Sequence, residues 1–293
     1  MKKALVIINP KAGRGKLARE LAEIDNILYQ GGYEADIYFT KCRKDATAKV
    51  EKDAGMYDIV VCGGGDGTYN EVITGLLNSE LNIPVGYIPS GTTNDFATTL
   101  EIPTVYRTAA EKIVSGEPRK IDVGKFGDVY FSYIASFGAF TRASYEANQK
   151  IKNVLGHMAY ILEGIKDISS IKSYKLKIET EDELIDDEFI FCAVCNSKSI
   201  AGLIRLDEKI VDLSDGMFEL ILVRMPDQII EFPSIISSLK KGSNNDKNLV
   251  FIHTNSVKIK TESNLDWSLD GEHVESTGDI EIKNLNGAVS LIL

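Results

Sequence analysis

Four glycines, an aspartate and a threonine follow the apolar run 58–62: Gly63, Gly64, Gly65, Asp66, Gly67 and Thr68. Glycines at the end of a buried strand let the backbone approach a ligand and turn its N–H groups toward it. A helix that begins beside Thr68 adds the positive end of its dipole, which favours an anion. The segment 63–68 therefore predicts a phosphate-binding loop, whereas a plain turn from strand to helix would need one glycine rather than four.

Asp66 limits how this loop can work, because a carboxylate repels bare phosphates. We expect it to act through Mg²⁺ or to orient a hydroxyl group. A Walker-type loop is absent from the sequence, since Gly15-Lys16 is followed by Leu17 instead of serine or threonine. A dinucleotide fingerprint fits residues 13–18 formally, but two basic residues lie inside it and no acidic residue closes the second predicted strand. A dehydrogenase is therefore the weaker alternative.

The elements that must position the loop alternate over the first 120 residues. The sequence predicts strands over residues 3–9, 34–40, 58–62 and 84–88, the first of them an apolar run. It predicts helices over 16–30, 45–54 and 68–77, the first of them with apolar positions three and four apart. Repeated strand–helix units of this length imply a parallel sheet covered by helices. We expect an α/β domain over residues 1–120, to which a C-terminal segment of about 284–293 could return.

Residues 121–283 are expected to form a second, β-rich domain. Cys192 and Cys195 form a C-x-x-C there, but positions three apart in a strand point to opposite faces, so we interpret them as packing residues. The pattern is typical of an antiparallel sandwich or barrel with helical insertions. Its predicted strands are 123–131, 174–179, 189–194, 217–223, 257–261, 280–282 and 289–293, and its predicted helices are 151–168 and 232–240.

The charge balance narrows the class of partner. The chain has 33 basic and 43 acidic residues, a net charge of −10 and a pI near 5.0. An acidic surface repels phosphate backbones, so we expect no nucleic-acid binding. No apolar run approaches the roughly 20 residues of a membrane span, and the first residues lack the apolar core of a secretory signal. These features predict a cytoplasmic location.

Three motifs occur in order: Asn9-Pro10-x-Ala12-Gly13, Gly64-Gly-Asp-Gly-Thr-x-Asn-Glu-Val72 and Pro89-x-Gly91-Thr92-x-Asn94-Asp95-Phe96-Ala97. Together they resemble the diacylglycerol kinase catalytic domain family, which includes bacterial soluble lipid kinases and sphingosine kinases. The Gly-Gly-Asp-Gly-Thr element alone is shared with NAD kinases and, more loosely, phosphofructokinases. The resemblance extends over essentially the whole chain, and it implies a first domain with an NAD kinase- or phosphofructokinase-like fold.

The resemblance implies an ATP site at the carboxyl ends of the predicted parallel strands. Arg14 and Lys16 could neutralise phosphate charge there, and Asn94 and Asp95 could either belong to the site or cap the next short helix. The residues implied to line the ATP site are Asn9, Pro10, Lys11, Ala12, Gly13, Thr40, Gly64, Gly65, Asp66, Gly67, Thr68, Tyr69, Asn70 and Thr92.

Magnesium ligands are implied in two further segments. Asp122 resembles the aspartate of a family Asp-x-Gly element and would help Asp66 to organise the catalytic magnesium through water. The segment 212–217 resembles a structural magnesium loop, in which Asp215 gives its carboxylate while Asp212 and Met217 contribute through the backbone. A hairpin turn with Asp-Gly at its tip is a compatible alternative for this segment.

The general base is implied in the Asp-Gly-Glu element at residues 270–272. An acceptor hydroxyl is a poor nucleophile until a carboxylate takes its proton. Glu272 is the predicted base and Asp270 is the near alternative, because the sequence does not separate them.

The resemblance thus predicts an ATP-dependent, Mg²⁺-requiring lipid kinase that converts diacylglycerol to phosphatidic acid. Its implied partners are a membrane-derived lipid alcohol, the inner face of a membrane through peripheral contact, and a second copy in a homodimer. The alternatives are an NAD kinase-like or other soluble-substrate kinase, and an inactive nucleotide-binding regulatory protein. Residues 136–140 and 197–205 carry a single glycine each where the family is glycine-rich, which leaves the identity of the lipid open.

Overall fold

The computed structural model describes residues 1–92, 94–139, 171–197, 199–200, 204–205, 211–241 and 246–293. The chain divides into two compact units, the first formed by residues 1–122 with 287–293 and the second by residues 123–286. The sequence-based boundaries were 120/121 and 283/284. The chain therefore passes from one unit to the other twice, in strands β5 (Pro118–Phe126) and β17 (Ile280–Ile292).

The first unit contains a parallel sheet with the strand order β17–β4–β3–β1–β2. The strands β1, β3 and β4 are mostly apolar and buried because both of their faces are covered, and β3 is buried at every position, whereas the edge strand β2 is mixed and partly exposed. Ile8 stands opposite both Phe39 and Gly63, and Gly63 stands opposite Ile88, so the strands end level with one another. The four N-terminal strands are β1 (Lys2–Ile8), β2 (Tyr33–Phe39), β3 (Ile59–Gly64) and β4 (Val85–Pro89).

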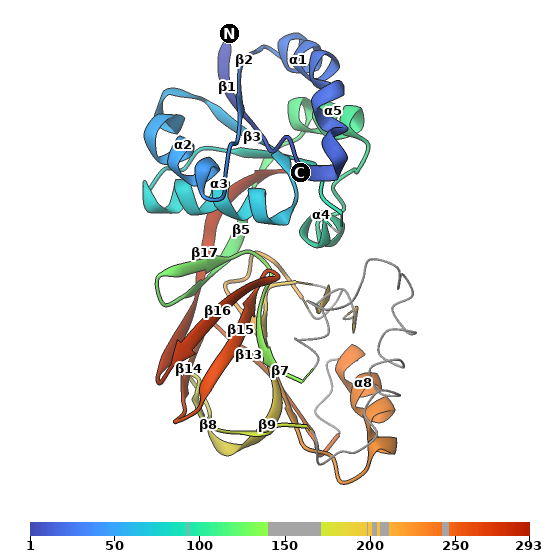
Figure 1. Cartoon of the computed structure of the whole chain (residues 1–293), viewed down its shortest axis with the longest axis vertical. Coiled ribbons are helices and arrows are strands. Elements are labelled where there is room, and N and C mark those ends of the chain that lie inside the picture. Colours follow the sequence, from blue (N-terminus) through green and yellow to red (C-terminus); the bar gives the residue numbers. More distant parts are fainter. Residues whose placement is uncertain (93, 140–170, 198, 201–203, 206–210, 242–245) are drawn as a thin grey trace. The chain divides into compact units, whose positions relative to one another are not determined.

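Helices cover both faces of this sheet (Figure 1). On one face, Ala4, Val6 and Ile8 pack with apolar residues of α1 and α5, including Ile24 and Ile113. On the other face α2 packs beside α3. The expected α/β domain is confirmed. Its helices are α1 (Leu21–Gln30), α2 (Asp45–Asp53), α3 (Asp66–Asn78), α4 (Asp95–Thr99) and α5 (Tyr106–Ser115).

Two helix starts were predicted wrongly. α1 begins at Leu21 instead of residue 16, because residues 12–19 form two short 3₁₀ turns (Ala12–Gly15 and Leu17–Arg19). Gly13, Arg14 and Gly15 there have φ of 56°, 61° and 71°, which no right-handed helix accommodates. α3 begins at Asp66 instead of Thr68. α5 was not predicted, because its buried face is partly alanine, which gives a weak apolar signal.

The second unit is an antiparallel β structure around one apolar core. The long strand β9 (Leu184–Cys195) is its centre and pairs with β7, β8 and β12. The core includes Phe137, Phe189, Phe218 and Trp267. The other strands are β6 (Val129–Phe131), β7 (Ile134–Gly138), β8 (Tyr174–Glu179), β10 (Ser199–Ile200), β11 (Ile204–Arg205), β12 (Phe218–Arg224), β13 (Leu249–Thr254), β14 (Ser256–Lys260), β15 (Asn264–Leu269) and β16 (Glu272–Thr277).

The expected β-rich half is confirmed, with differences in detail. The predicted strand 123–131 is two strands, because Gly127, with φ 54°, turns the chain between β5 and β6. The predicted strands 280–282 and 289–293 are parts of one strand, β17. Helix α8 (Phe232–Lys240) has the expected bounds, whereas the helix predicted over 151–168 lies outside the described residues. Cys192 and Cys195 are both buried free thiols.

Candidate functional site

The loops after the parallel strands are joined into one rim by backbone hydrogen bonds. Asn9 N–H donates to the Gly63 carbonyl over 2.8 Å, and Thr40 N–H donates to the Ile8 carbonyl over 2.9 Å. Ser90 N–H donates to the Gly64 carbonyl over 2.7 Å. The loops of the three motifs and the segment of Thr40, which are far apart in the sequence, therefore lie side by side at the carboxyl edge of the sheet. Ligands of α/β folds bind at this edge.

Asn9 connects two of these loops through its side chain. Its Nδ2 donates to the Thr68 Oγ1 over 3.0 Å, while its Oδ1 accepts the Lys11 N–H over 3.0 Å. The amide thus fixes the first turn of α3 against the turn that follows β1. A short polar side chain with both a donor and an acceptor is needed at this position, which asparagine provides.

The four glycines of the predicted loop have different roles. A Cβ on Gly63 would lie 2.5 Å from Ile8 Cδ1, and one on Gly64 would lie 2.4 Å from Thr68 Cβ, so both are required by packing. A Cβ on Gly65 would lie 3.1 Å from Gly91 Cα, so Gly65 lets two loops approach each other. Gly67 is exposed, and among the described residues no atom lies within 4 Å of its added Cβ.

The predicted six-residue loop is therefore mostly regular structure. β3 continues through Gly64 and α3 begins at Asp66, which leaves Gly65 alone between them. The open surface left for an anion is the N-terminal turn of α3 around Gly67. Helix N-termini carry unpaired N–H groups and the positive end of the dipole, which is the property that the glycine pattern predicted.

Asp66 is held by the start of the next helix. Its carboxylate accepts the Asp95 N–H over 3.0 Å and the Phe96 N–H over 3.4 Å, and Tyr87 Oη donates to it over 3.4 Å. Burial raises the pKa of Asp66 above its ordinary value, while these hydrogen bonds act in the opposite direction. Burial, together with the charge of Asp66, also raises the pKa of Asp95. Asp66 and Asp95 are thus two neighbouring, partly buried carboxylates of like charge, an arrangement that suits the binding of a cation.

Asn94 and Asp95 have separate roles in this arrangement. The Asn94 side chain bonds to Gly91 twice, accepting its N–H over 2.8 Å and donating to its carbonyl over 3.1 Å. Asn94 is buried and left-handed, with φ 52°, so it shapes the third motif instead of facing a ligand. Asp95 lies against Asp66, and its place in the motif was the one sign of this in the sequence.

Other residues implied for the ATP site differ in exposure. The ring of Tyr69 is buried and lies 4.8 Å, centroid to centroid, from both Tyr87 and Phe96, so its side chain supports α3 from within. Thr92 is exposed at the rim. Lys11, Arg14 and Lys16 are also exposed, and among the described residues none of the three forms an ion pair. They are available to an anion in a chain of net charge −10.

Asp122 ties two strands of the first unit together. It is fully buried, and its Oδ1 accepts the Gly287 N–H over 2.7 Å. Gly287 has a φ of 58°, a conformation that favours glycine, in the middle of β17. Asp122 therefore stabilises the kink of β17 beside β5. The predicted water-mediated link between Asp122 and a magnesium ion stays a prediction.

The hairpin of β15 and β16 separates the two candidate bases. Asp270 and Gly271 form its two-residue turn, with φ of 49° and 86°, as a type I′ hairpin requires. The Asp270 carboxylate is buried and accepts three backbone N–H groups, from Ser132 over 2.5 Å and from Tyr133 and Ile134 over 3.0 Å each. Glu272 follows the turn and is exposed. Asp270 is thus committed to the fold, whereas Glu272 is accessible.

The loop 212–217 presents oxygen atoms. Asp212 Oδ1 accepts the Ser214 N–H over 3.0 Å, and Asp215 Oδ1 accepts the Met217 N–H over 2.9 Å, so one oxygen of each carboxylate shapes the loop. Asn284 Nδ2 donates to the Met217 carbonyl over 3.0 Å, which leaves one lone pair of that carbonyl for another partner. Two exposed carboxylates and a carbonyl are ligands that suit Mg²⁺ or Ca²⁺.

Glu219, close to this loop, supports a cation there. It is 1% exposed, and its Oε2 has no hydrogen-bond partner among the described residues. Burial, followed by the charge of Asp215, raises the pKa of Glu219 to about 9. A positive ion held by Asp215 would lessen this repulsion. The residues present therefore fit a bound hard cation.

Comparison with known proteins adds to this geometry. The family model for the diacylglycerol kinase catalytic domain matches residues 3–126. A diacylglycerol kinase of Bacillus subtilis (strain 168) is 34% identical over 277 residues, which span 93% of this chain and 90% of that protein. The chain belongs to the diacylglycerol kinase family. It is therefore classed with the lipid kinases, which transfer a phosphoryl group to an alcohol.

Further relatives agree with this assignment. A diacylglycerol kinase of Staphylococcus aureus (strain MRSA252) is 32% identical over 276 residues, which span 93% of this chain and 86% of that protein. A crystal structure of a diacylglycerol kinase from Bacillus anthracis str. Sterne superposes with a TM-score of 0.78 at 26% identity, covering 99% of this chain and 96% of that one. Within the described part of this family member, no helix is long and apolar enough to cross a membrane.

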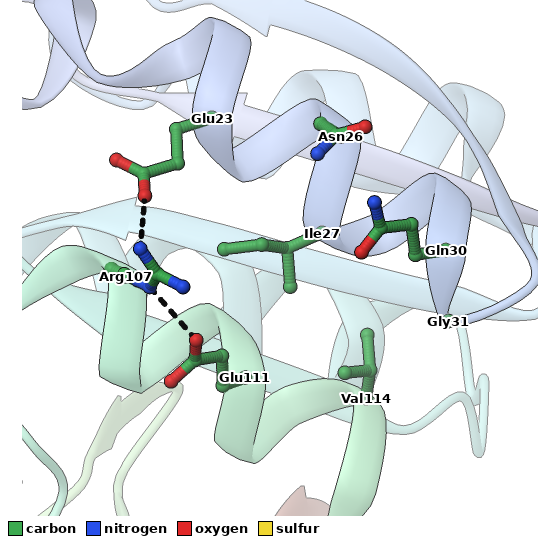
Figure 2. A pocket seen from close by; sticks show the side chains of 8 residues that line it. All are labelled: Glu23, Asn26, Ile27, Gln30, Gly31, Arg107, Glu111 and Val114. Carbon is green, nitrogen blue, oxygen red and sulfur yellow. Dashed lines mark hydrogen bonds and ion pairs between the residues drawn. The ribbon is translucent and has the colours of Figure 1, made fainter.

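A groove of about 460 Å³ between α1 and α5 stands apart from these residues (Figure 2). Arg107 in its wall pairs with Glu23 over 3.2 Å and with Glu111 over 2.9 Å. Its lining includes none of the residues that the three motifs name. We therefore assign it no part in the family's chemistry.

Proposed function

We propose that the chain transfers the γ-phosphoryl group of ATP to the hydroxyl of diacylglycerol in a Mg²⁺-dependent reaction. The observation that carries the proposal is the rim of the first unit, where hydrogen bonds join the loops of all three motifs around the open N-terminal turn of α3. Lys11, Arg14 and Lys16, which are exposed on that rim, supply positive charge for a triphosphate.

In the proposed reaction, the side chains position the phosphates and move one proton. The N–H groups around Gly67 and the loop cations hold the triphosphate. Glu272 takes the proton of the acceptor hydroxyl while the oxygen of that hydroxyl forms a bond to the γ-phosphorus. The bond from that phosphorus to the oxygen bridging the β-phosphate breaks, and ADP leaves with the electron pair.

Each unit has carboxylates that would hold a magnesium ion of its own. We assign Asp66, assisted by Asp95, to the catalytic ion, and Asp212, Asp215 and the Met217 carbonyl to a structural ion. Bound Mg²⁺ neutralises charge on the transferring phosphoryl group. Asp122 would act indirectly, since its Oδ1 accepts the backbone N–H of Gly287.

Diacylglycerol is proposed as the acceptor because the curated relatives bear the name diacylglycerol kinase. A lipid acceptor must be reached at a bilayer surface, so we also propose peripheral contact with a membrane. A homodimer remains a further proposal.

The test is a transfer assay with several acceptors. The purified chain is incubated with Mg²⁺, γ-labelled ATP and mixed detergent micelles that contain diacylglycerol, a sphingoid base or undecaprenol, with NAD as a soluble acceptor. We expect label in phosphatidic acid, and none when EDTA replaces Mg²⁺. Label in NAD with no labelled lipid would refute the lipid kinase. Stabilisation of the chain by ATP without transfer to any alcohol would instead indicate a nucleotide-binding protein without catalysis.

A further inference from the structure

Three potential metal ligands, none of them part of the loop 212–217, meet on the β15–β16 hairpin. They are Asp266 of β15 with His273 and Glu275 of β16. One ligand atom of each lies within 4.8 Å of the others, and the His273 Nε2 lies 3.5 Å from the Asp266 Oδ1. All three residues are exposed, so the group can be reached from solvent.

The strand register explains why these three residues meet. Asp266 stands directly opposite Glu275, and His273 stands opposite Ser268, one diagonal step from Asp266. The alternate residues Leu265 and Trp267 point into the core, which sends the side chain of Asp266 to the other face. Trp267 Nε1 donates to the buried Ser276 Oγ over 3.1 Å, which locks this register. The ligands are therefore held in place by the hairpin and its core contacts.

The cross-strand charges of this hairpin differ from those of the β8–β9 pair in the same sheet. Opposite Lys175 and Lys177 of β8, strand β9 places Glu188 and Asp186, so these cross-strand pairs are of opposite sign. Asp266 and Glu275 are instead a pair of like charges placed directly opposite, which is unfavourable in a sheet. Lys260 also stands opposite Lys177, but Lys177 has Asp186 on its other side. A cation between Asp266 and Glu275 would turn repulsion into attraction.

We propose that Asp266, His273 and Glu275 bind a divalent transition-metal ion of the Zn²⁺ class. Zinc ligands lie about 2.1 Å from the metal, so two ligands of a tetrahedral site are about 3.4 Å apart. The His273–Asp266 distance of 3.5 Å already has this value. An imidazole nitrogen selects Zn²⁺, Co²⁺ or Ni²⁺ over Mg²⁺, which prefers oxygen ligands alone. The fourth position is left to water.

A metal at this place joins the two strands of the hairpin. Glu272 is the first residue of β16 and immediately precedes His273. The bound ion would restrict the strand that carries the proposed base, and this consequence alone rests on the proposed function. Binding of the ion does not depend on catalysis, so its test needs no substrate.

The test measures metal binding to the full chain freed of metal with EDTA. Zn²⁺ is titrated by calorimetry in the presence of excess Mg²⁺, and Co²⁺ is titrated with its visible absorption as the readout. We expect one Zn²⁺ site that Mg²⁺ does not displace, and a Co²⁺ spectrum of low coordination number. Asp266→Asn and His273→Gln should each weaken this Zn²⁺ binding at least ~10-fold, since each removes one of three ligands.

His253→Gln is the matched control. His253 is also exposed, but it lies outside the hairpin cluster, and its Nε2 is 3.9 Å from the Glu219 Oε1. This variant should retain the Zn²⁺ affinity of the wild type. Circular dichroism checks the fold of each variant, and Glu275→Gln replaces any variant that does not fold. Equal Zn²⁺ affinity in the wild type and in the hairpin variants, or no Zn²⁺ binding by the wild type, would overturn the proposal.

Discussion

Glu272 and Asp270 show how two neighbouring carboxylates acquire different chemistry. The turn Asp270–Gly271 reverses the chain, so the two side chains have different surroundings although they are two residues apart. Three backbone N–H groups hold the Asp270 carboxylate, whereas Glu272 is exposed. A base must reach the proton that it removes, and only Glu272 has that access.

We expect Glu272→Gln to lower kcat by about 10²–10⁴ because it removes the proton acceptor but keeps the shape of the side chain. The free energy of unfolding should change by less than about 0.5 kcal/mol, as at other exposed positions. The measurements are the initial rate of lipid phosphorylation and a urea titration. Wild-type kcat in this variant would remove Glu272 from the mechanism.

Asp270→Asn should mainly lower the stability of the chain, in contrast to Glu272→Gln, which should mainly lower kcat. Asparagine tolerates the left-handed φ of 49°, but it replaces one carboxylate oxygen that accepts a backbone N–H. We expect a loss of about 1.5–3 kcal/mol in the free energy of unfolding, the usual size for a hydrogen bond to a charged group. Urea titration measures this loss. Unchanged stability together with abolished turnover would make Asp270 the base instead.

The substitutions Gly64→Ala and Gly67→Ala form a second matched pair of variants. Gly67→Ala meets open space in the first turn of α3, so we expect stability to be kept or raised by about 0.5–1 kcal/mol. The added methyl group would displace the phosphates, and we expect KM for ATP to rise ~10-fold. Gly64→Ala, with Thr68 Cβ at 2.4 Å, should instead destabilise the chain by about 1–3 kcal/mol. Steady-state kinetics and urea titration distinguish them, and an unchanged KM in Gly67→Ala would place the phosphates elsewhere.

The sequence was sufficient to identify these residues, but it did not predict which residues surround them. Residue type and spacing identified the glycines, Asp66 and the Asp-Gly-Glu element. They did not show that Gly63 and Gly64 are needed for packing or that Tyr69 is buried, because burial depends on residues from other elements. Asp95 acquires its place beside Asp66 in the same way, through the short helix α4.

At the scale of elements, the loop 212–217 is a rigid turn that resembles a metal loop. Gly216 has a φ of 79°, and a Cβ there would lie 2.5 Å from the Asn286 Nδ2, so no other residue fits without strain. The loop orients Asp212 and Asp215 before any ion binds. The buried Oε2 of Glu219 has no hydrogen-bond partner in the described part of the chain, and an ion would offset the cost of burying it.

Mg²⁺ should therefore stabilise the wild-type chain through this loop. We expect millimolar Mg²⁺ to raise the melting temperature, and Asp215→Asn to abolish most of that rise by removing a charged oxygen ligand. The measurement is a melting curve with and without Mg²⁺. Asp266→Asn is the control and should keep the Mg²⁺ response. The cluster that contains Asp266 also contains His273, and Mg²⁺ prefers sites made of oxygen ligands alone. An equal response in Asp215→Asn and the wild type would contradict the assignment.

Elements were predicted well where one local pattern determines them. The parallel strands β1 and β3 are apolar runs, and α8 has clear helical spacing, so their bounds follow from the sequence. The start of α1 did not follow, since Gly13, Arg14 and Gly15 adopt left-handed φ that only their contacts explain, such as Gly13 against the Ser90 carbonyl. The β15–β16 hairpin was missed as a pair of strands because its turn was interpreted as a catalytic element.

At the scale of the molecule, the end of the chain completes the first unit. Residues 287–293 belong to it, and Leu291 pairs with Val85 of β4. Alternation of strands and helices predicted the class of each half. It did not predict that residues 280–292 form one continuous strand, because Asn284 to Gly287 resemble a loop by composition. The proposed homodimer and membrane contact belong to this scale too, and sedimentation and vesicle flotation test them.

The return of the C-terminal segment predicts a stability effect confined to one unit. Leu291 is fully buried, so Leu291→Ala should cost the first unit about 2–5 kcal/mol. Trp267, the single tryptophan of the chain, lies in the core of the second unit and reports on it alone. We expect circular dichroism to show an earlier urea transition, while the midpoint from tryptophan fluorescence stays in place. Lys283→Ala, on the exposed part of the same strand, is the control and should change stability by less than about 1 kcal/mol. If the fluorescence midpoint of Leu291→Ala falls as far as that from circular dichroism, the two units unfold together and the C-terminal segment stabilises both.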